Sequence, residues 1–135
     1  MKIVLISCCS KKLNHPAEAK NLYVSSLFKK SLAYARKINP DKIFILSAKY
    51  GLVDIEEKID PYNVTLNKMS MGDIENWSRI VLEKLREKFN LSNDEFIFLA
   101  GENYRKNLIS EIKNYKIPML GLGIGKQLQW LTTQI

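Results

Sequence analysis

Four continuous runs of apolar residues divide the chain, and each has the length of one β-strand. They are KIVLIS (2–7), KIFILS (42–47), EFIFLA (95–100) and IPMLGLGI (117–124). Continuous apolar runs, without alternation, are typical of strands that are buried on both faces of a parallel sheet. The pattern therefore predicts four strands in one mainly parallel sheet.

Between the strands, apolar residues recur at the spacing of amphipathic helices. We expect helices over 22–37, 70–88, 103–114 and 125–135. The first should end before Asn39 and Pro40, and Ser70 with Asp73 should form a capping box at the start of the second. The alternation of strands and helices favours a doubly wound, three-layer α/β/α sandwich, with residues 1–135 forming a single domain.

The carboxyl ends of the predicted strands carry small or polar residues, and parallel α/β sheets bind ligands at these ends. The four exits are SCCSKKL (7–13), SAKYGLV (47–53), AGENYRK (100–106) and GLGIGKQ (121–127). We expect these exits to share one rim, with Ser47, Lys49 and Tyr50 directed at a common site. The segment 53–69 is long for a loop in a compact domain, and long connections of this kind are often functional.

Composition and cysteine content indicate the kind of protein and the cellular compartment that we expect. The chain is 46% hydrophobic and 26% charged, which is ordinary for a globular protein, and its 135 residues are enough to bury a core without a disulfide or a metal. The only two cysteines, Cys8 and Cys9, are adjacent and cannot link distant segments, so we expect a cytoplasmic protein. No apolar run approaches the roughly 20 residues of a membrane span, and no membrane partner is expected.

The net charge of +7 is concentrated in residues 1–50, which hold ten Lys or Arg and two acids. An electropositive face attracts polyanions, so this distribution fits a phosphate-bearing partner. A lysine-rich solvated surface explains the same distribution, and charge alone favours that interpretation.

The cysteine pair offers a candidate nucleophile. A thiolate near cations has a lowered pKa, and Cys9 is close in sequence to Lys11 and Lys12. The alternative is that each cysteine packs as a small hydrophobic side chain. We favour packing for Cys8 and leave both interpretations open for Cys9. His15 is the only histidine, and neither a metal nor another cofactor is expected.

The last strand exit offers a candidate phosphate site. Gly123 and Gly125 precede Lys126 at an expected helix start, where backbone N–H groups can hold an anion. Close packing of a helix on a strand explains the glycines equally well. The segment lacks the glycine spacing of a nucleotide-binding P-loop, and no Ser or Thr follows Lys126 to hold magnesium.

Two further segments offer polar candidates. In AGENYR, Glu102 and Asn103 can hydrogen-bond to a ligand, although Asn103 is also a candidate helix N-cap; Tyr104 is expected in the core. In DPYN, Asp60 and Asn63 flank a turn, and ordinary turn chemistry explains both.

Several of these motifs together resemble a family of small bacterial and phage domains of unknown function. They are CSKKL, LYVSSLF, ILSAKYGLV, PYNVTL, LAGENYR and GLGIGKQLQWL, which extend over nearly the whole chain. That family is similar in turn to a group with a uracil-DNA-glycosylase-like fold, which includes a domain of archaeosine synthase. A cysteine, lysine, tyrosine and serine pattern of that domain resembles Cys9, Lys12, Tyr23 and Ser26. The chain lacks the water-activating motif and the histidine-bearing loop of true uracil-DNA glycosylases, so uracil excision is not expected.

The resemblance implies one site and supplies no established reaction. Its residues would be Cys9, Ser10, Lys11, Lys12, Tyr23, Ser26, Ser47, Lys49, Tyr50, Gly51, Asp60, Tyr62 and Asn63.

The leading functional hypothesis is an enzyme that acts on a nucleobase, in a nucleic acid or a nucleotide, by N-glycosidic cleavage or base modification. Asp60 or Glu102 would stabilise positive charge on the sugar, and Lys49 or Cys9 would act as a nucleophile. Tyr50 or Tyr62 would stack on the base. The alternatives are a non-catalytic module that binds nucleic acid or a nucleotide, and a thiol-dependent stress protein. A larger protein partner and the oligomeric state are left open.

Overall fold

Five strands form one twisted sheet in the order β4-β3-β1-β6-β7. The structure, a computed structural model, describes residues 1–135. The strands of this sheet are β1 (Lys2–Ser7), β3 (Lys42–Ser47), β4 (Gly51–Asp54), β6 (Glu95–Leu99) and β7 (Tyr115–Lys116). A separate two-stranded antiparallel sheet pairs β2 (Ala17–Glu18) with β5 (Lys58–Ile59).

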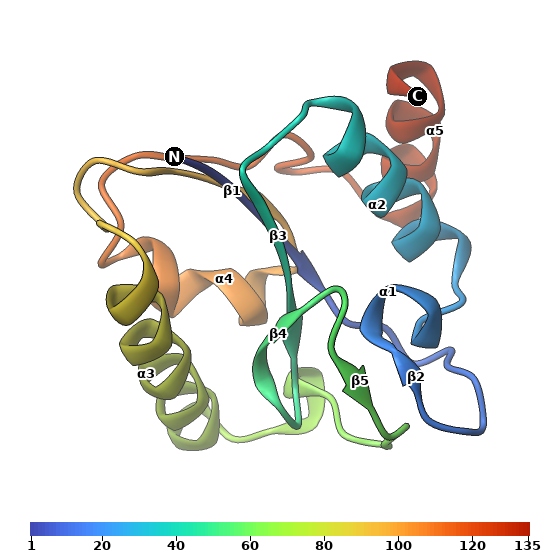
Figure 1. Cartoon of the computed structure of the whole chain (residues 1–135), viewed down its shortest axis with the longest axis horizontal. Helices are drawn as coiled ribbons and strands as arrows, with labels where there is room; N and C mark the ends of the chain where they lie inside the picture. The colour runs from blue at the N-terminus through green and yellow to red at the C-terminus, as the bar shows by residue number, and fades with distance from the viewer.

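Helices cover both faces of the large sheet, so the molecule has three layers (Figure 1). On one face lie α3 (Met71–Lys88) and α4 (Glu102–Ile109), and the short 3-10 helix η1 (Leu66–Lys68) precedes α3. On the other face lie α1 (Ala19–Leu22), α2 (Ser26–Lys37) and α5 (Ile124–Gln134). The expected α/β class and the helical layers are therefore present.

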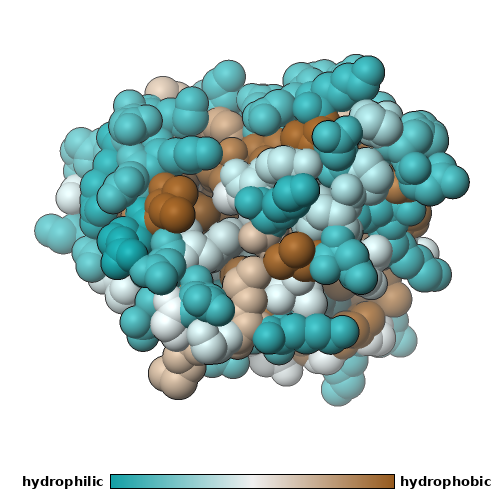
Figure 2. Space-filling model, turned by 90° about the horizontal axis from the view of Figure 1, so that it is seen from below, coloured by the Kyte–Doolittle hydropathy of each residue, from teal (hydrophilic) through white to brown (hydrophobic).

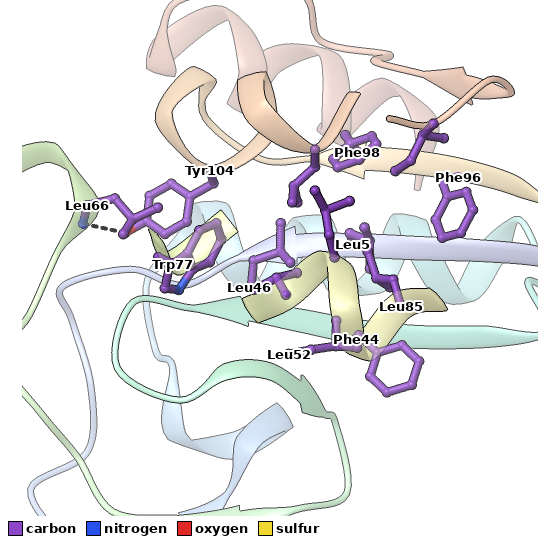
Figure 3. Close-up of a cluster of buried hydrophobic side chains, with 14 of the residues drawn as sticks. Leu5, Phe44, Leu46, Leu52, Leu66, Trp77, Leu85, Phe96, Phe98 and Tyr104 are labelled. Carbon is purple, nitrogen blue, oxygen red and sulfur yellow. Dashed lines mark hydrogen bonds between the residues drawn. The ribbon is translucent and has the colours of Figure 1, made fainter. Parts of the chain in front are cut away.

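The sheet separates two hydrophobic cores, because successive side chains of a strand point to opposite faces. In β1, Ile3 and Leu5 pack beneath α3 and α4, whereas Val4 and Ile6 pack beneath α2 and α5. β3 and β6 alternate in the same way. Figure 3 shows the core beneath α3 and α4, where leucine and phenylalanine side chains of β1, β3 and β6 meet Leu85 of α3.

Three of the four predicted strands are present and parallel. β1 pairs with β3 on one side and with β6 on the other, in parallel register. The prediction of four strands is wrong in number, because the chain after β3 turns back at once. Residues 48–50 form a tight turn, and β4 pairs with β3 in the antiparallel direction. Gly51 has φ +76°, a backbone conformation that glycine adopts without strain.

The prediction of a strand over 117–124 is also wrong. The fifth strand, β7, occupies Tyr115–Lys116, and the residues that follow form turns. Pro118 cannot donate to a strand ladder, and Gly121 has φ +81°. The run is apolar because Met119 packs into the core beneath α2 and α5, while Leu120 is exposed to solvent.

The four predicted helices are present at the expected positions, but some of their first and last residues differ from the prediction. Ser70 caps α3 by accepting a hydrogen bond from the backbone N–H of Asp73, which is one of the two bonds of the predicted capping box; the Asp73 carboxylate accepts none from Ser70 N. α2 begins at Ser26, four residues later than expected, because Ser25 is its N-cap and accepts from Phe28 N. α4 ends five residues early, at Ile109. The long segment 53–69 contains β5 and η1 between stretches without regular structure.

Candidate active site

β1 and β3 end side by side at one edge of the sheet, and a loop crosses this edge. The backbone N–H of Cys8, one residue past β1, donates to Leu46 O of β3 at 3.0 Å. Tyr62, in the loop after β5, packs against buried residues of both cores, and so does Cys8. Because the sheet separates the two cores, side chains that contact both must lie at its end. Cys8 and Tyr62 therefore close the carboxyl edge.

A chain of hydrogen bonds runs through this edge. The hydroxyl of Ser47 accepts from Tyr50 N at 3.0 Å and donates to the Tyr62 hydroxyl at 2.8 Å. The Tyr62 and Tyr23 hydroxyls are 2.6 Å apart, and either oxygen can be the donor. Ser47 is fully buried and Tyr23 is 1% exposed. Buried hydroxyls require partners, and here the side chains of three separate segments supply them to one another.

A second set of contacts holds the crossing loop against α4. The Tyr104 hydroxyl accepts a hydrogen bond from Leu66 N at 3.3 Å and from the Cys8 thiol at 3.5 Å. The Trp77 indole donates to the carbonyl of Ser47 at 2.8 Å and packs edge-on against the Tyr104 ring. Figure 3 shows Tyr104, Leu66 and Trp77 gathered at one end of the core. α3 and α4 thereby fix the β3–β4 turn and the crossing loop.

Three phenols are held in their protonated form: Tyr23 and Tyr104 are buried, and Tyr62 is half-buried. Burial raises the pKa of Tyr23 and Tyr62 well above the usual range and raises the pKa of Tyr104 to about 12. The nearby Cys8 thiol adds to the rise in pKa of all three, since a negative charge there would disfavour a second one. At neutral pH these hydroxyls therefore keep their protons and do not act as bases.

Two lysines lie beside the tyrosine rings. Lys12 Nζ is 4.4 Å from the centroid of the Tyr62 ring and 5.8 Å from that of Tyr23. Lys49 Nζ is 5.2 Å from the centroid of the Tyr50 ring, and the Tyr50 and Tyr62 rings meet edge to face at 5.5 Å. We call these five residues the cation–tyrosine cluster. Neither lysine forms an ion pair, so both amines can bind an anion.

The backbone explains how Lys12 reaches the rings. Lys12 forms an isolated antiparallel bridge with Tyr23, supported by bonds from Val24 N to Lys11 O and from Leu13 N to Leu22 O.

Figure 2 views the molecule from below, the side toward which β4 and β5 lie in Figure 1. In the middle of this face, residues of intermediate hydropathy, the class of tyrosine and serine, lie among a few hydrophobic residues, and hydrophilic residues surround them.

Some of the predicted site residues come together and others do not. The cluster and its hydrogen bonds unite Lys12, Tyr23, Ser47, Lys49, Tyr50 and Tyr62. Asp60 joins them through its backbone carbonyl, which accepts from the Tyr50 hydroxyl at 3.4 Å, while its carboxylate forms no hydrogen bond or ion pair. Gly51 follows the turn as the first residue of β4. The Cys9 thiol donates to the carbonyl of Lys11 at 3.3 Å, and its side chain is half-buried.

Other candidates lie apart from the cluster. Glu102 and Asn103 are in the first turn of α4, and the Asn103 amide donates to the side chain of Asn67 at 2.9 Å. The N-cap of α4 is Gly101, so the alternative of Asn103 as the N-cap is wrong. Gly123, Gly125 and Lys126 are at the start of α5, and no side-chain hydrogen bond links them to the cluster. Four further predicted site residues have exposed side chains that form no hydrogen bond: Ser10, Lys11, Ser26 and Asn63.

The predictions that Cys8 packs as a small side chain and that Tyr104 lies in the core are confirmed, since Tyr104 is buried and Cys8 packs against both cores. The sequence reasoning missed the polar contact between them, in which the Cys8 thiol donates to the Tyr104 hydroxyl. A tyrosine in a buried helical stripe carries a hydroxyl that needs a partner, and this requirement was the available signal.

Of two cavities in the molecule, one lies away from the cluster and the other adjoins it at Tyr23. The larger, of about 620 Å³, is at the carboxyl end of α3 and in the following turn, and it is lined by both acids and bases, among them Arg86, Lys88 and Glu111. The smaller, of about 360 Å³, lies between α1 and α2 and is partly lined by Tyr23. Lys49, Asp60 and Glu102 line neither cavity.

Comparisons with known proteins identify a family whose function is unknown. The model of a family of unknown function, DUF6884, matches residues 3–133. No curated protein and no solved structure matches the chain. No group of three His, Cys, Asp or Glu side chains is arranged to hold a metal ion. None of the helices combines the length and apolar character needed to cross a bilayer.

Proposed function

The chain belongs to DUF6884, a family of unknown function, and we propose from its site that it is a nucleobase- or nucleotide-directed enzyme. The observation that carries the proposal is the cation–tyrosine cluster, where Tyr50 and Tyr62 lie beside the unpaired amines of Lys12 and Lys49. A base stacked on an aromatic ring gains about 1–3 kcal/mol. Amines next to the rings attract the phosphate or the electron-rich edge of the same ligand.

N-glycosidic cleavage is one reaction that fits these groups, and base modification is the other. In hydrolysis the bond between the base nitrogen and the anomeric carbon breaks, and the electron pair leaves with the base. A water oxygen bonds to that carbon while its proton passes to a carboxylate. Asp60 would take that proton and stabilise the sugar cation, and the Lys12 amine would stabilise charge on the base.

The remaining catalytic candidates act in variants of this proposal. Lys49, on the β3–β4 turn next to Tyr50, would attack the anomeric carbon in place of water. Its amine would first lose a proton to a carboxylate, the base would leave with the electron pair, and water would then hydrolyse the bond between the lysine nitrogen and the sugar. Glu102 and Cys9 would have to act from outside the hydrogen-bonded cluster. A uracil-DNA-glycosylase-like fold belongs to the same proposal, and parallel strands β6, β1 and β3 with helices on both faces are compatible with it.

A thermal-shift screen tests the proposal. The purified chain is heated with free bases, nucleosides, nucleotides and oligonucleotides at low and high salt. A ligand at about 100 times its Kd stabilises the fold by roughly 2.7 kcal/mol, which raises Tm by several degrees. We expect at least one base-containing compound to raise Tm, and Tyr50→Ala to remove that rise. Tyr115→Ala, on the distant edge strand β7, should retain it and is the matched control.

Chromatography of the reaction mixture then decides whether the bound compound is altered. A released base or a modified base supports the enzyme. Binding without any change supports the second candidate, a non-catalytic binding module. That candidate is favoured by the Asp60 carboxylate, which no neighbouring side chain orients. Absence of any Tm rise with every base-containing compound would show that both candidates are wrong.

A further inference from the structure

The cavity between α1 and α2 has a lining that is basic and apolar. Its volume is about 360 Å³, and its walls are Lys20, Asn21, Tyr23, Val24, Lys29, Leu32, Ala33 and Arg36. Three of these residues are cationic and none is acidic. The cavity therefore suits a ligand that combines negative charge with an apolar surface.

Two of the three cations are free to bind such a ligand. Lys20 is occupied, since its amine is 2.7 Å from Glu56 and 3.5 Å from Glu18. Lys29 and Arg36 form no ion pair and lie seven residues apart on α2. At 1.5 Å of rise per residue their backbones are separated by about 10.5 Å. The two side chains can therefore contact different phosphates of one strand.

One buried residue, Tyr23, adjoins both the cavity and the proposed site. Tyr23 lines the cavity, and its hydroxyl is 2.6 Å from the Tyr62 hydroxyl in the hydrogen-bonded chain. A ligand that occupies both places must pass Tyr23 and extend beyond a single base. A nucleic-acid strand has that length, whereas a free nucleoside does not.

We infer that the substrate base is presented by a nucleic-acid strand whose neighbouring phosphates bind Lys29 and Arg36 in the α1–α2 cavity. The inference rests on the proposed function, because it assigns a substrate class to the same site. It is supported by the concentration of basic residues in positions 1–50, to which both cations belong.

Salt-dependent binding of an oligonucleotide tests the inference. A dye-labelled single strand of about ten nucleotides, within the usual site size of strand-binding domains, is titrated with the full chain over a range of salt. Each phosphate contacted on a single strand contributes about −0.7 to the slope of log affinity on log salt. The double variant Lys29→Gln with Arg36→Gln should weaken binding and make the slope shallower by about 1.4.

Matched variants separate this inference from the proposed function. Lys84→Gln with Lys88→Gln removes the same charge from exposed positions of α3, across the sheet, and should leave the slope near that of the wild type. Equal slopes for the two double variants would overturn the inference, even where nucleosides still raise Tm in a Tyr50-dependent manner. Binding of mononucleotides without binding of the strand would also overturn it. If neither nucleosides nor the strand bind the wild type, the proposed function itself fails.

Discussion

At the amino end of the sheet, polar side chains bond to the backbone and to the N-terminal amine, whereas at the carboxyl end they bond to one another as well as to the backbone. Asp41 accepts from Lys2 N at 2.7 Å, and Asp94 accepts from Asn90 N at 2.8 Å and from the N-terminal amine at 2.6 Å. These bonds fasten turns to strands. At the carboxyl end the hydroxyls of Ser47, Tyr23 and Tyr62 form their own chain.

The difference distinguishes polar groups that stabilise the fold from polar groups that are free to bind a ligand. Each carboxylate at the amino end has a local partner that explains its presence. At the carboxyl end, two lysines lie over aromatic rings and have no counter-ion, and a thiol lies among phenols. The carboxyl end is therefore the better candidate for function.

The largest expected effect comes from removing a ring at the carboxyl end. Tyr23→Ala removes a buried aromatic side chain that packs on Phe28 and contacts Tyr62, and it should lower the free energy of unfolding by about 3–5 kcal/mol. Tyr23→Phe removes only the hydroxyl and should cost about 1–2 kcal/mol. Urea denaturation measures both. Equal losses for the two variants would contradict the packing role of the ring.

High pH should weaken the carboxyl end selectively. The raised pKa values of Tyr23, Tyr62 and Tyr104 mean that these phenols keep their protons in the folded state after they ionise in the unfolded one. Their contribution to stability is complete below about pH 10 and falls above it, by up to about 1.4 kcal/mol per pH unit for each tyrosine. Phenolate absorbance during alkaline unfolding should show three of the six tyrosines ionising together with the loss of structure.

A smaller effect is expected at the amino end. Asp94→Ala removes the partner of the N-terminal amine and of Asn90 N, and should lower the free energy of unfolding by less than Tyr23→Phe does, because solvent screens an ion pair at the surface. The pKa of Asp94 is lowered mainly by its bond to the N-terminal amine, so its contribution is present near neutral pH and is lost as the pH falls through that lowered pKa. The wild type should therefore approach the variant in acid. A constant difference from neutral to acid pH would contradict this assignment.

The smallest effect on stability and the most informative one on function belong to Lys49. Its side chain is exposed and has no hydrogen bond, so Lys49→Ala should change the free energy of unfolding by less than about 0.5 kcal/mol. Turnover of a base-containing substrate should be abolished if Lys49 is the nucleophile. An active Lys49→Ala protein would remove Lys49 from the mechanism. Lys58→Ala, at an exposed position of β5, is the control.

Much of the fold could be predicted because burial on both faces leaves a plain signal. β1, β3 and β6 each appear as a continuous apolar run, and the cap at Ser70 is local in sequence. The segment 117–124 has the same apolar character for a different reason, since the side chain of Met119 reaches the core from a turn. Apolarity alone does not distinguish these two situations.

The sequence predicted which residues belong to the candidate site better than it predicted which of them contact one another. Topology alone brought Ser47 and Tyr50 to the carboxyl edge. It did not indicate that the chain reverses at Gly51, because a three-residue turn and a strand exit use the same small and polar residues. Nor could it pair the Tyr104 hydroxyl with Cys8, since 96 positions separate them and the contact depends on how α4 packs.

The two tryptophans lie on opposite faces of the sheet, and this placement has a spectroscopic use. Trp77 donates its indole N–H to the residue that begins the β3–β4 turn, whereas Trp130 packs against Tyr34 between α5 and α2. In a Trp130→Phe background, emission would come from a single indole whose hydrogen bond ends at Ser47. Binding of a ligand at the neighbouring cluster would then shift the wavelength or lower the intensity of the tryptophan fluorescence, without any label attached to the protein.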